Sequence, residues 1–273
     1  MILELKKYIY NLIFFRIKFW VKLNFNQLIR LQIKNPKSIP IIIINFNQLY
    51  YLKKLIHFLQ ERKFENIIII DNHSTYPPLL EYYMSLKNVK IEMMEENFGN
   101  MVFFKNESLQ EKYGKGFFVL TDADIVPNEN LPEDFMKVMM SILIKEFNTV
   151  NKVGFALDIE NIPEYYVFKD KVIRWEKKFW KKKYKETPLS YKAYIDTTFA
   201  IYKPFYPTKF NHQEFLEGVR LAGDFTAIHG GWFVDINNLT EEQIYYQETS
   251  SSASSWLINK DGALDPKHSS KYL

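Results

Sequence analysis

Between residues 39 and 120, short apolar runs alternate with segments whose apolar residues recur at helical spacing. Each run has the length of a strand that is buried on both faces of a sheet. Each intervening segment repeats its apolar residues every three or four positions, as helices that cover a sheet do. This alternation predicts right-handed βαβ units, and therefore an α/β fold with a mostly parallel central sheet flanked by helices. The apolar runs are residues 39–44, 67–70 and 117–120, residues 89–93 are expected to form a further strand, and helices are expected near residues 49–62, 77–86 and 100–113.

The second half of the chain follows this pattern less regularly. A length of 273 residues suits one large α/β domain with appendages. We predict a single domain over residues 38–260, an N-terminal arm over residues 1–37 and a polar C-terminal tail over residues 261–273. Further expected elements are a helix over residues 132–147 and strands at residues 153–157 and 193–202.

The N-terminal arm holds eight Lys or Arg residues and one acid, Glu4, although the net charge of the whole chain is only +4. Its longest stretch without charge, residues 8–15, is shorter than the roughly 20 residues that span a bilayer. No small-residue cleavage site follows, which argues against a secretory signal. On a helical wheel, apolar and basic side chains separate, as in helices that lie on anionic membranes. We therefore expect residues 1–35 to bind an anionic membrane surface; packing on the protein's own core or on a second subunit is the alternative.

Charge and composition also exclude several classes of function. The net positive charge of the chain is confined to the arm. It therefore does not form the basic working face of a nucleic-acid-binding domain, and we expect no nucleic-acid partner. The chain has no cysteine, which excludes disulfides, thiolate metal sites and a cysteine nucleophile. No G-x-G-x-x-G follows the first run and no G-x-x-x-x-G-K-[ST] occurs, so neither a dinucleotide fingerprint nor a P-loop is present.

Polar residues follow each of the four expected strands. Ligands of open parallel sheets bind at the carboxyl ends of the strands, so we expect these residues to line one crevice. Asp122 and Asp124 form the only D-x-D pair in the chain. Two carboxylates after a buried strand can hold a hard divalent cation that in turn binds a diphosphate, although a turn or cap is the commoner use of aspartate. The residues after the expected strands are Asn45 and Asn47, Asp71, Asn97 and Gly99, and Asp122 and Asp124.

Four segments carry a likeness to a known family: IIIINFNQLYYLKKLI, IIIIDNHSTYPPLLEYY, ENFGN and FFVLTDADIVP. They resemble a family 2-type glycosyltransferase of the GT-A fold, well over residues 39–135 and at only a few points in the second half. The resemblance implies a Rossmann-like nucleotide-binding half merged with an acceptor-binding half. It also implies a UDP- or GDP-linked sugar donor, a Mn2+ or Mg2+ ion, and inverting transfer to a glycan or glycolipid hydroxyl.

By this resemblance, the nucleotide contacts fall on residues after the first three expected strands. Asn45 and Asn47 stand at the family's first nucleotide-contacting loop. Asp71 matches the carboxylate that accepts from the nucleobase, and an Asx-turn cap is its alternative role. Asn97 and Gly99 match the ENxG loop beside the ribose.

The resemblance also assigns the metal site. Asp122 would reach the ribose or a metal-bound water, and Asp124 would bind the metal itself. His229 resembles the C-terminal metal-binding histidine of many GT-A enzymes, and its imidazole would complete a mixed oxygen and nitrogen shell that Mn2+ accepts. A core histidine satisfied by the backbone is the alternative for His229.

Inverting transfer requires a base that takes the proton of the acceptor hydroxyl as it attacks. Asp196 is our first candidate because it lies in sequence between the D-x-D pair and the histidine, where GT-A enzymes usually place their base. The chain departs from the family here, since the usual Glu-Asp pair is replaced by Ile-Asp. Asp158 and Asp224 are rival bases, and Asp196 could instead hold a strand end through Thr197.

Two tryptophans, Trp175 and Trp232, are candidates for stacking on acceptor sugar rings, and core packing is the alternative for both. Two other functions also stay open: a nucleotidyltransferase that makes sugar nucleotides, and a non-catalytic carbohydrate- or membrane-binding module. The first would need a Gly-rich, basic triphosphate signature, and the second would not need paired acids at a strand end. The setting we expect is bacterial surface polysaccharide synthesis, in the cytoplasm at the inner face of the membrane.

Overall fold

The computed structural model describes residues 17, 19–147, 149–186, 188–204 and 217–250. These residues form a mixed α/β structure around one sheet, whose strands follow the order β3-β2-β1-β4-β9-β6-β10-β8-β7, with β5 paired to β10. The strands are β1 Ile41–Asn45, β2 Ile67–Asp71, β3 Val89–Met93, β4 Phe118–Asp122, β5 Ile125–Pro127, β6 Lys152–Leu157, β7 Lys183–Glu186, β8 Leu189–Tyr194, β9 Ala200–Tyr202 and β10 Glu217–His229. The α-helices are α2 Gln27–Lys34, α3 Tyr50–Glu61, α4 Pro77–Ser85, α5 Val102–Lys105, α6 Glu107–Tyr113, α7 Phe135–Lys145, α8 Lys169–Lys177 and α10 Glu241–Thr249, and the 3-10 helices are η1 Pro36–Ser38, η2 Lys178–Trp180 and η3 Gly230–Trp232.

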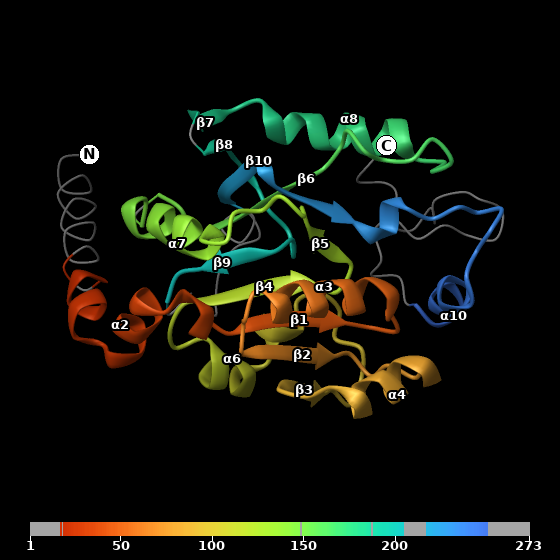
Figure 1. Ribbon diagram of the computed structural model, residues 1–273, viewed down its shortest axis with the longest axis horizontal. Helices are drawn as coiled ribbons and strands as arrows, with labels where there is room; N and C mark the ends of the chain where they lie inside the picture. The colour runs from red at the N-terminus through yellow and green to blue at the C-terminus, as the bar shows by residue number, and fades with distance from the viewer. Residues whose placement is uncertain (1–16, 18, 148, 187, 205–216, 251–273) are drawn as a thin grey trace, which may run out of the picture.

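The directions of the strands make the sheet largely parallel. β1 is parallel to β2 and to β4, and β2 is parallel to β3. β9 is antiparallel to both β4 and β6, so β6 runs in the direction of β4, and β10 is parallel to β6. The expected α/β fold with a mostly parallel sheet and flanking helices is therefore confirmed (Figure 1).

Burial on both faces explains why β1 and β2 are apolar up to their last residue. Ile41 and Ile43 of β1 belong to a cluster that includes the apolar side of α3, whereas Ile42 and Ile44 belong to a second cluster that includes Phe103 of α5. All five residues of β1, and all five of β2, are buried. A strand between two apolar layers has no face that water can reach, so its sequence shows a continuous run and not an alternation.

Two expected elements are each divided in the structure. The helix expected over residues 100–113 breaks at Asn106, whose side chain accepts a hydrogen bond from the Leu109 N–H (3.1 Å) and so starts α6 anew. The strand expected over residues 193–202 is two strands, because β8 ends at Tyr194 and β9 begins at Ala200. β8 pairs with β10, whereas β9 pairs with β4. The turn between β8 and β9 brings Asp196 to the carboxyl end of β4, where the neighbouring Thr197 carbonyl accepts from the Asp122 N–H.

The structure describes only part of the expected N-terminal arm and none of the expected C-terminal tail. Residues 1–16 of the arm and the whole expected tail lie outside the described residues, so the apolar and basic sides expected for that part of the arm stay a prediction. The described part of the arm contains α2, which leads through η1 into β1. No helix within the described ranges has the length and hydropathy of a membrane span.

Candidate active site at the carboxyl ends of the strands

The register of β1 with its neighbours brings the predicted rim together. Asn45 at the end of β1 pairs with Asp71 at the end of β2, and Ile44 pairs with Asp122 at the end of β4. The polar residues that follow these strands therefore share one edge of the sheet, as parallel strands require.

Asp71 is fully buried and is satisfied by its own chain. One carboxylate oxygen accepts from the Ser74 N–H (2.6 Å), and the other accepts from the Tyr83 hydroxyl (2.6 Å). Burial, together with the neighbouring Asp71 charge, raises the pKa of Tyr83 far above its usual value, so the phenol stays a donor. The Ser74 contact matches the local capping role that is the alternative for Asp71.

Two amide oxygens at the same rim have no donor within the described part of the chain. The Asn45 amide donates to the Tyr83 hydroxyl (2.8 Å) and to the Gln48 carbonyl (3.0 Å), but its Oδ1 is buried without a partner. Asn72, the residue after β2, donates to the Gly99 carbonyl (3.1 Å), and its Oδ1 is likewise buried and unpaired. Buried acceptors without donors carry a free-energy cost that a bound N–H group or an ordered water would relieve.

Asn47 holds three segments of the rim together. It has a positive φ of 50° and is fully buried. Its side-chain oxygen accepts from the N–H groups of Thr75 (2.7 Å) and Tyr76 (3.0 Å), and its amide donates to the Thr249 hydroxyl (2.9 Å). Every polar atom of this side chain thus has a partner in the protein, so the structure gives Asn47 a role in shaping the loop.

The loop that contains Asn97 and Gly99 lies against the end of β2. The Asn97 side chain accepts from the Gly99 N–H (2.9 Å), and Gly99 has a φ of +76°, in the left-handed region that favours glycine. The Gly99 carbonyl in turn accepts from Asn72. This contact places the predicted ribose loop beside the other rim residues.

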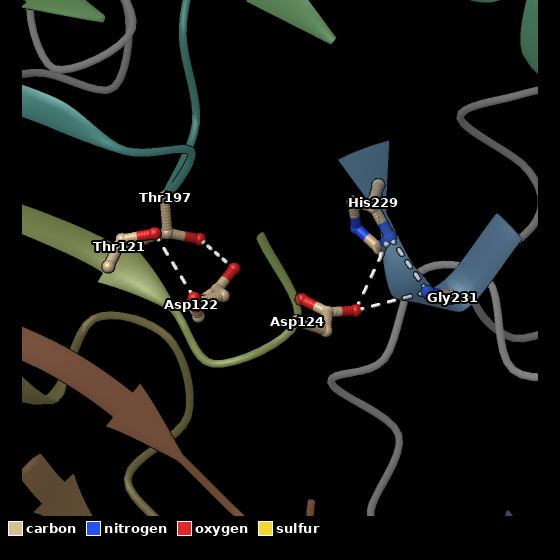
Figure 2. A network of polar contacts seen from close by, with 6 residues as sticks. All are labelled: Thr121, Asp122, Asp124, Thr197, His229 and Gly231. Atoms are coloured by element: carbon tan, nitrogen blue, oxygen red, sulfur yellow. Dashed lines mark hydrogen bonds and ion pairs between the residues drawn. The ribbon is translucent and has the colours of Figure 1, made fainter. Parts of the chain in front are cut away.

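Asp122 closes β4 and faces the turn between β8 and β9. Its carboxylate accepts from the Thr197 hydroxyl, and its N–H donates to the Thr197 carbonyl (2.8 Å). Burial raises the pKa of Asp122 well above its usual value, and the charges of Asp124 and then Asp196 add to that rise. Three carboxylates therefore act on one another at this edge of the sheet (Figure 2 shows two of them).

Asp124 and His229 meet at a single backbone N–H. The Gly231 N–H lies 3.2 Å from Asp124 Oδ2 and 3.1 Å from His229 Nδ1, and these two acceptor atoms are 3.3 Å apart (Figure 2). In the neutral tautomer that carries its proton on Nδ1, the imidazole would donate a hydrogen bond to Asp124. In the other tautomer the Nδ1 lone pair faces the carboxylate, and a metal ion between the two atoms would bind both.

The histidine ring is held by its neighbours. His229 ends β10, where it pairs with Ile125 of β5, and its ring stacks on Trp232 with centroids 5.0 Å apart and planes 9° apart. Trp232 is only 1% exposed, which favours its core-packing alternative over acceptor stacking. Trp175 lies half-buried on α8 with the Lys178 ammonium over its ring, and its expected acceptor contact stays a prediction.

Asp196 is the exposed member of the acid cluster. Its carboxylate accepts from the Asn100 amide (3.4 Å), and its backbone carbonyl accepts from Lys152 Nζ (3.4 Å). Of its rivals, Asp158 accepts three hydrogen bonds from Glu160 and Asn161, so it caps the loop after β6. Asp224 lies exposed at the point where the register between β10 and β6 shifts.

Lys152 and Glu242 contribute to the site although sequence reasoning missed both. Lys152 begins β6, is fully buried, and donates to the Tyr202 hydroxyl (3.0 Å) as well as to Asp196. Burial lowers the pKa of Lys152 to about 7, although the Asp196 charge acts to raise it. A lysine that opens the apolar run of β6 was the one sequence signal for it.

Glu242 joins α10 to the helix that follows β1. Its carboxylate accepts from the N–H groups of Leu49 (2.9 Å) and Tyr50 (3.0 Å), where the helix dipole favours a negative charge. Tyr245 of α10 donates to the Thr75 hydroxyl (3.0 Å). The C-terminal helix therefore lies along the rim, at the carboxyl ends of the strands (Figure 1).

The donor atoms suit a metal ion only in part. No group of three or more His, Asp or Glu side chains among the described residues could hold a metal ion by itself. Asp124 and His229 nevertheless offer one oxygen and one nitrogen on a shared side. Mg2+ in proteins is commonly held by one or two side chains together with substrate phosphates and water, so this pair fits an ion that arrives with a diphosphate. The metal roles expected for Asp122, Asp124 and His229 stay predictions.

Comparisons with known proteins concern the fold. No protein-family model and no curated protein matches this chain. Among solved structures, the chain is similar to the mannosyltransferase PcManGT from Pyrobaculum calidifontis in complex with GDP-Man and Mn2+, with a TM-score of 0.46, 13% identity, and coverage of 84% of this chain and 66% of that one. It is also similar to a cytidylyltransferase from Leptospira borgpetersenii, with a TM-score of 0.32, 12% identity, and coverage of 46% and 56% respectively. This chain thus spans slightly less than two thirds of the length of the first protein, and neither likeness assigns a family or an activity.

Proposed function

We propose that this protein is a metal-dependent glycosyltransferase that moves a sugar from a nucleotide-diphosphate donor to a hydroxyl group. The observation that carries the proposal is the contact between Asp124 Oδ2 and His229 Nδ1 (3.3 Å) beside two further carboxylates, Asp122 and Asp196. Such a concentration of acceptors and negative charge at the carboxyl ends of a largely parallel sheet is suited to a cation and its anionic ligand. The resemblance to family 2 glycosyltransferases supports the same reading.

The nucleotide would bind along the ends of β1 and β2. The unpaired acceptors Asn45 Oδ1 and Asn72 Oδ1 are buried there and suit the N–H groups of a nucleobase. The Asn97 and Gly99 loop would lie beside the ribose, as the resemblance implies. Asp71 would orient Tyr83 and the loop at Ser74, because both of its oxygens are engaged with them.

A Mn2+ or Mg2+ ion would be held by Asp124 and His229, with Asp122 close by. When bound, the ion would supply several kcal/mol of stabilisation to the negative charge of a departing nucleoside diphosphate. Trp232 would fix the orientation of the imidazole through the stacking contact. With the ion on His229 Nδ1, the Gly231 N–H would keep only its hydrogen bond to Asp124 Oδ2, which has a second lone pair for the metal.

Asp196 would act as the base on the acceptor. Its carboxylate is exposed, lies in the electrostatic range of Asp122, and is oriented by Asn100. A base in this position would take the proton of an acceptor hydroxyl as that oxygen attacks the anomeric carbon opposite the diphosphate, which gives inversion. The acceptor would be a glycan or glycolipid hydroxyl of a surface polysaccharide.

The proposal is tested by screening nucleotide-sugars with Mn2+ for release of free UDP or GDP, and by thermal shift with either nucleotide. We expect stabilisation by the nucleotide only when Mn2+ or Mg2+ is present. Asp124→Asn should abolish that stabilisation, whereas Asp224→Asn, an exposed carboxylate of β10, should leave it intact. Release of pyrophosphate from a nucleoside triphosphate and a sugar phosphate would indicate a nucleotidyltransferase instead. Sugar binding that does not depend on the metal would indicate a non-catalytic module.

A further inference from the structure

The described part of the arm presents an apolar surface to solvent. Phe25 is 70% exposed, Trp20 59% and Leu31 55%, and the Trp20 and Phe25 rings meet edge to face with centroids 6.2 Å apart. Scattered exposed apolar residues are ordinary, but seven of them within residues 17–33, two with their rings in contact, are typical of an interaction surface. We call this surface the arm face; its exposed apolar residues are Ile17, Trp20, Val21, Phe25, Leu28, Leu31 and Ile33.

The opposite side of the arm is firmly attached to the domain. Gln32 is 1% exposed, and its amide group bonds both the N–H and the carbonyl of Phe117, each at 2.8 Å. Ile29 is fully buried, and the Phe19 ring stacks on Phe147 with planes 4° apart. The side chains that attach the arm to the domain therefore come from both of its helical segments, residues 19–25 and α2, and the arm face consists of other side chains of these segments.

Charge indicates the chemistry of the partner. Residues 17–37 contain five basic residues (Lys18, Lys22, Arg30, Lys34 and Lys37) and no acid. A symmetric dimer through this face would bring the like charges of both copies together, which is unfavourable. An anionic surface would instead be attracted by each of them. Exposed Trp and Phe beside Lys and Arg is the composition of helices that lie at the boundary between headgroups and acyl chains.

An apolar groove adjoins the arm face. It has a volume of about 490 Å³ and runs between the arm and the end of α7, with Phe19, Trp20, Leu23, Ile144 and Phe147 among its lining residues. Pockets that hold small molecules have comparable volumes and are mostly apolar. A groove of this kind beside a basic surface suits an acyl chain whose headgroup is anionic.

The arm face and the acid cluster lie at opposite edges of the sheet. α2 leads directly into the amino end of β1, and Gln32 bonds the residue before β4, whereas Asp122 closes β4 at its carboxyl end (Figure 1). Contact through the arm face would leave the acid cluster accessible. Binding to a surface and binding to a nucleotide are therefore separable properties of this chain.

We propose that the arm face docks on a bilayer that carries anionic phospholipids, with Trp20, Phe25 and Leu31 entering the headgroup boundary and Arg30 and Lys34 contacting the phosphates. The arm face continues the apolar side that the wheel of the first residues predicts, and extends it into α2 through Leu28 and Leu31. The proposal is independent of the proposed function.

Co-sedimentation with vesicles tests the proposal. The full chain should bind vesicles of phosphatidylcholine and phosphatidylglycerol in equal parts, should not bind pure phosphatidylcholine, and should dissociate in high salt. The double variant Arg30→Gln and Lys34→Gln should bind roughly 30-fold more weakly. The double variant Phe25→Ser and Leu31→Ser should bind at least about tenfold more weakly, since both side chains lose their apolar contact. All four positions are exposed, so folding should be retained.

Matched controls use exposed residues of other surfaces. Met84→Ser, at a side chain that is 80% exposed on α4, and the double variant Lys87→Gln and Lys115→Gln should bind vesicles like the unchanged protein. Equal binding by the Phe25 and Leu31 variant would overturn the proposal. The proposal would also be overturned if the unchanged chain did not bind vesicles and light scattering showed a dimer that the Phe25 and Leu31 variant dissociates. Loss of nucleotide stabilisation with intact vesicle binding would overturn only the proposed function.

Discussion

The buried bond between Tyr83 and Asp71 can be removed by changing one atom. Tyr83→Phe deletes the hydroxyl that donates to Asp71 Oδ2 (2.6 Å) and accepts from the Asn45 amide (2.8 Å). Asp71 would keep only the Ser74 N–H, in a position with no exposure to water. The Asn45 amide would keep its bond to the Gln48 carbonyl. The main loss is therefore one hydrogen bond to a buried carboxylate.

A hydrogen bond to a charged group contributes roughly 1.5–3 kcal/mol, and the lost acceptor for Asn45 adds a smaller amount. We expect Tyr83→Phe to lower the free energy of unfolding by about 2 to 3 kcal/mol. For a domain of this size, such a loss corresponds to a fall in Tm of roughly 5 to 10 °C. Urea unfolding followed by circular dichroism measures the free energy, and calorimetry measures the Tm.

Tyr82→Phe is the control, because it removes the same atom one residue earlier in α4. Tyr82 is half-buried, and its hydroxyl has no hydrogen-bond partner among the described residues. We expect its variant to stay within about 0.5 kcal/mol of the unchanged protein. If the two variants prove equally stable, Asp71 is not satisfied through Tyr83, and the reasoning about the rim is wrong.

Two other buried ionisable groups give predictions of their own. Glu176→Gln should lower the free energy of unfolding by about 3 kcal/mol or more in urea unfolding, because it leaves the guanidinium of buried Arg220, which lies 2.5 Å from the Glu176 carboxylate, without its charge partner. Glu164→Gln, which breaks the ion pair of an exposed carboxylate with Lys169, should cost no more than about 1 kcal/mol. Equal losses in the two variants would contradict this account. Burial lowers the pKa of Lys152 from 10.5 to about 7, so the unfolded chain binds the extra proton between these pH values and stability rises with pH across that window. Lys152→Met should remove this contribution, and an unchanged slope in unfolding measured from pH 7 upward would refute it.

Much of the architecture follows from local patterns. The wholly apolar runs of β1, β2 and β4 predict strands between two apolar layers, and the structure has them there. The break at Asn106 was also local, since an Asn side chain competes for backbone N–H groups, but it was missed because the apolar periodicity continues across it. Periodicity indicates which face is buried, whereas a cap decides where a helix begins.

The candidate site was only partly predictable. Rim residues such as Asn45, Asp71 and Asp122 were found because the carboxyl ends of parallel strands must share an edge. The partners of these residues were not found. Nothing in the segment around Asp71 indicates that Tyr83 of the next helix donates to its carboxylate, since the contact depends on how α4 lies against β2.

The sequence by itself determined β1 to β4, the helices that follow β1 and β2, the rim at the carboxyl ends and the basic character of the arm. Each of these depends on residues that are close in the chain, where spacing and side-chain chemistry suffice. Only the tertiary structure decided that Lys152 lies buried under Asp196 and that Glu242 caps the helix after β1. These contacts join segments far apart in the chain, and they depend on the order of strands in the sheet. A short stretch of sequence does not specify that order.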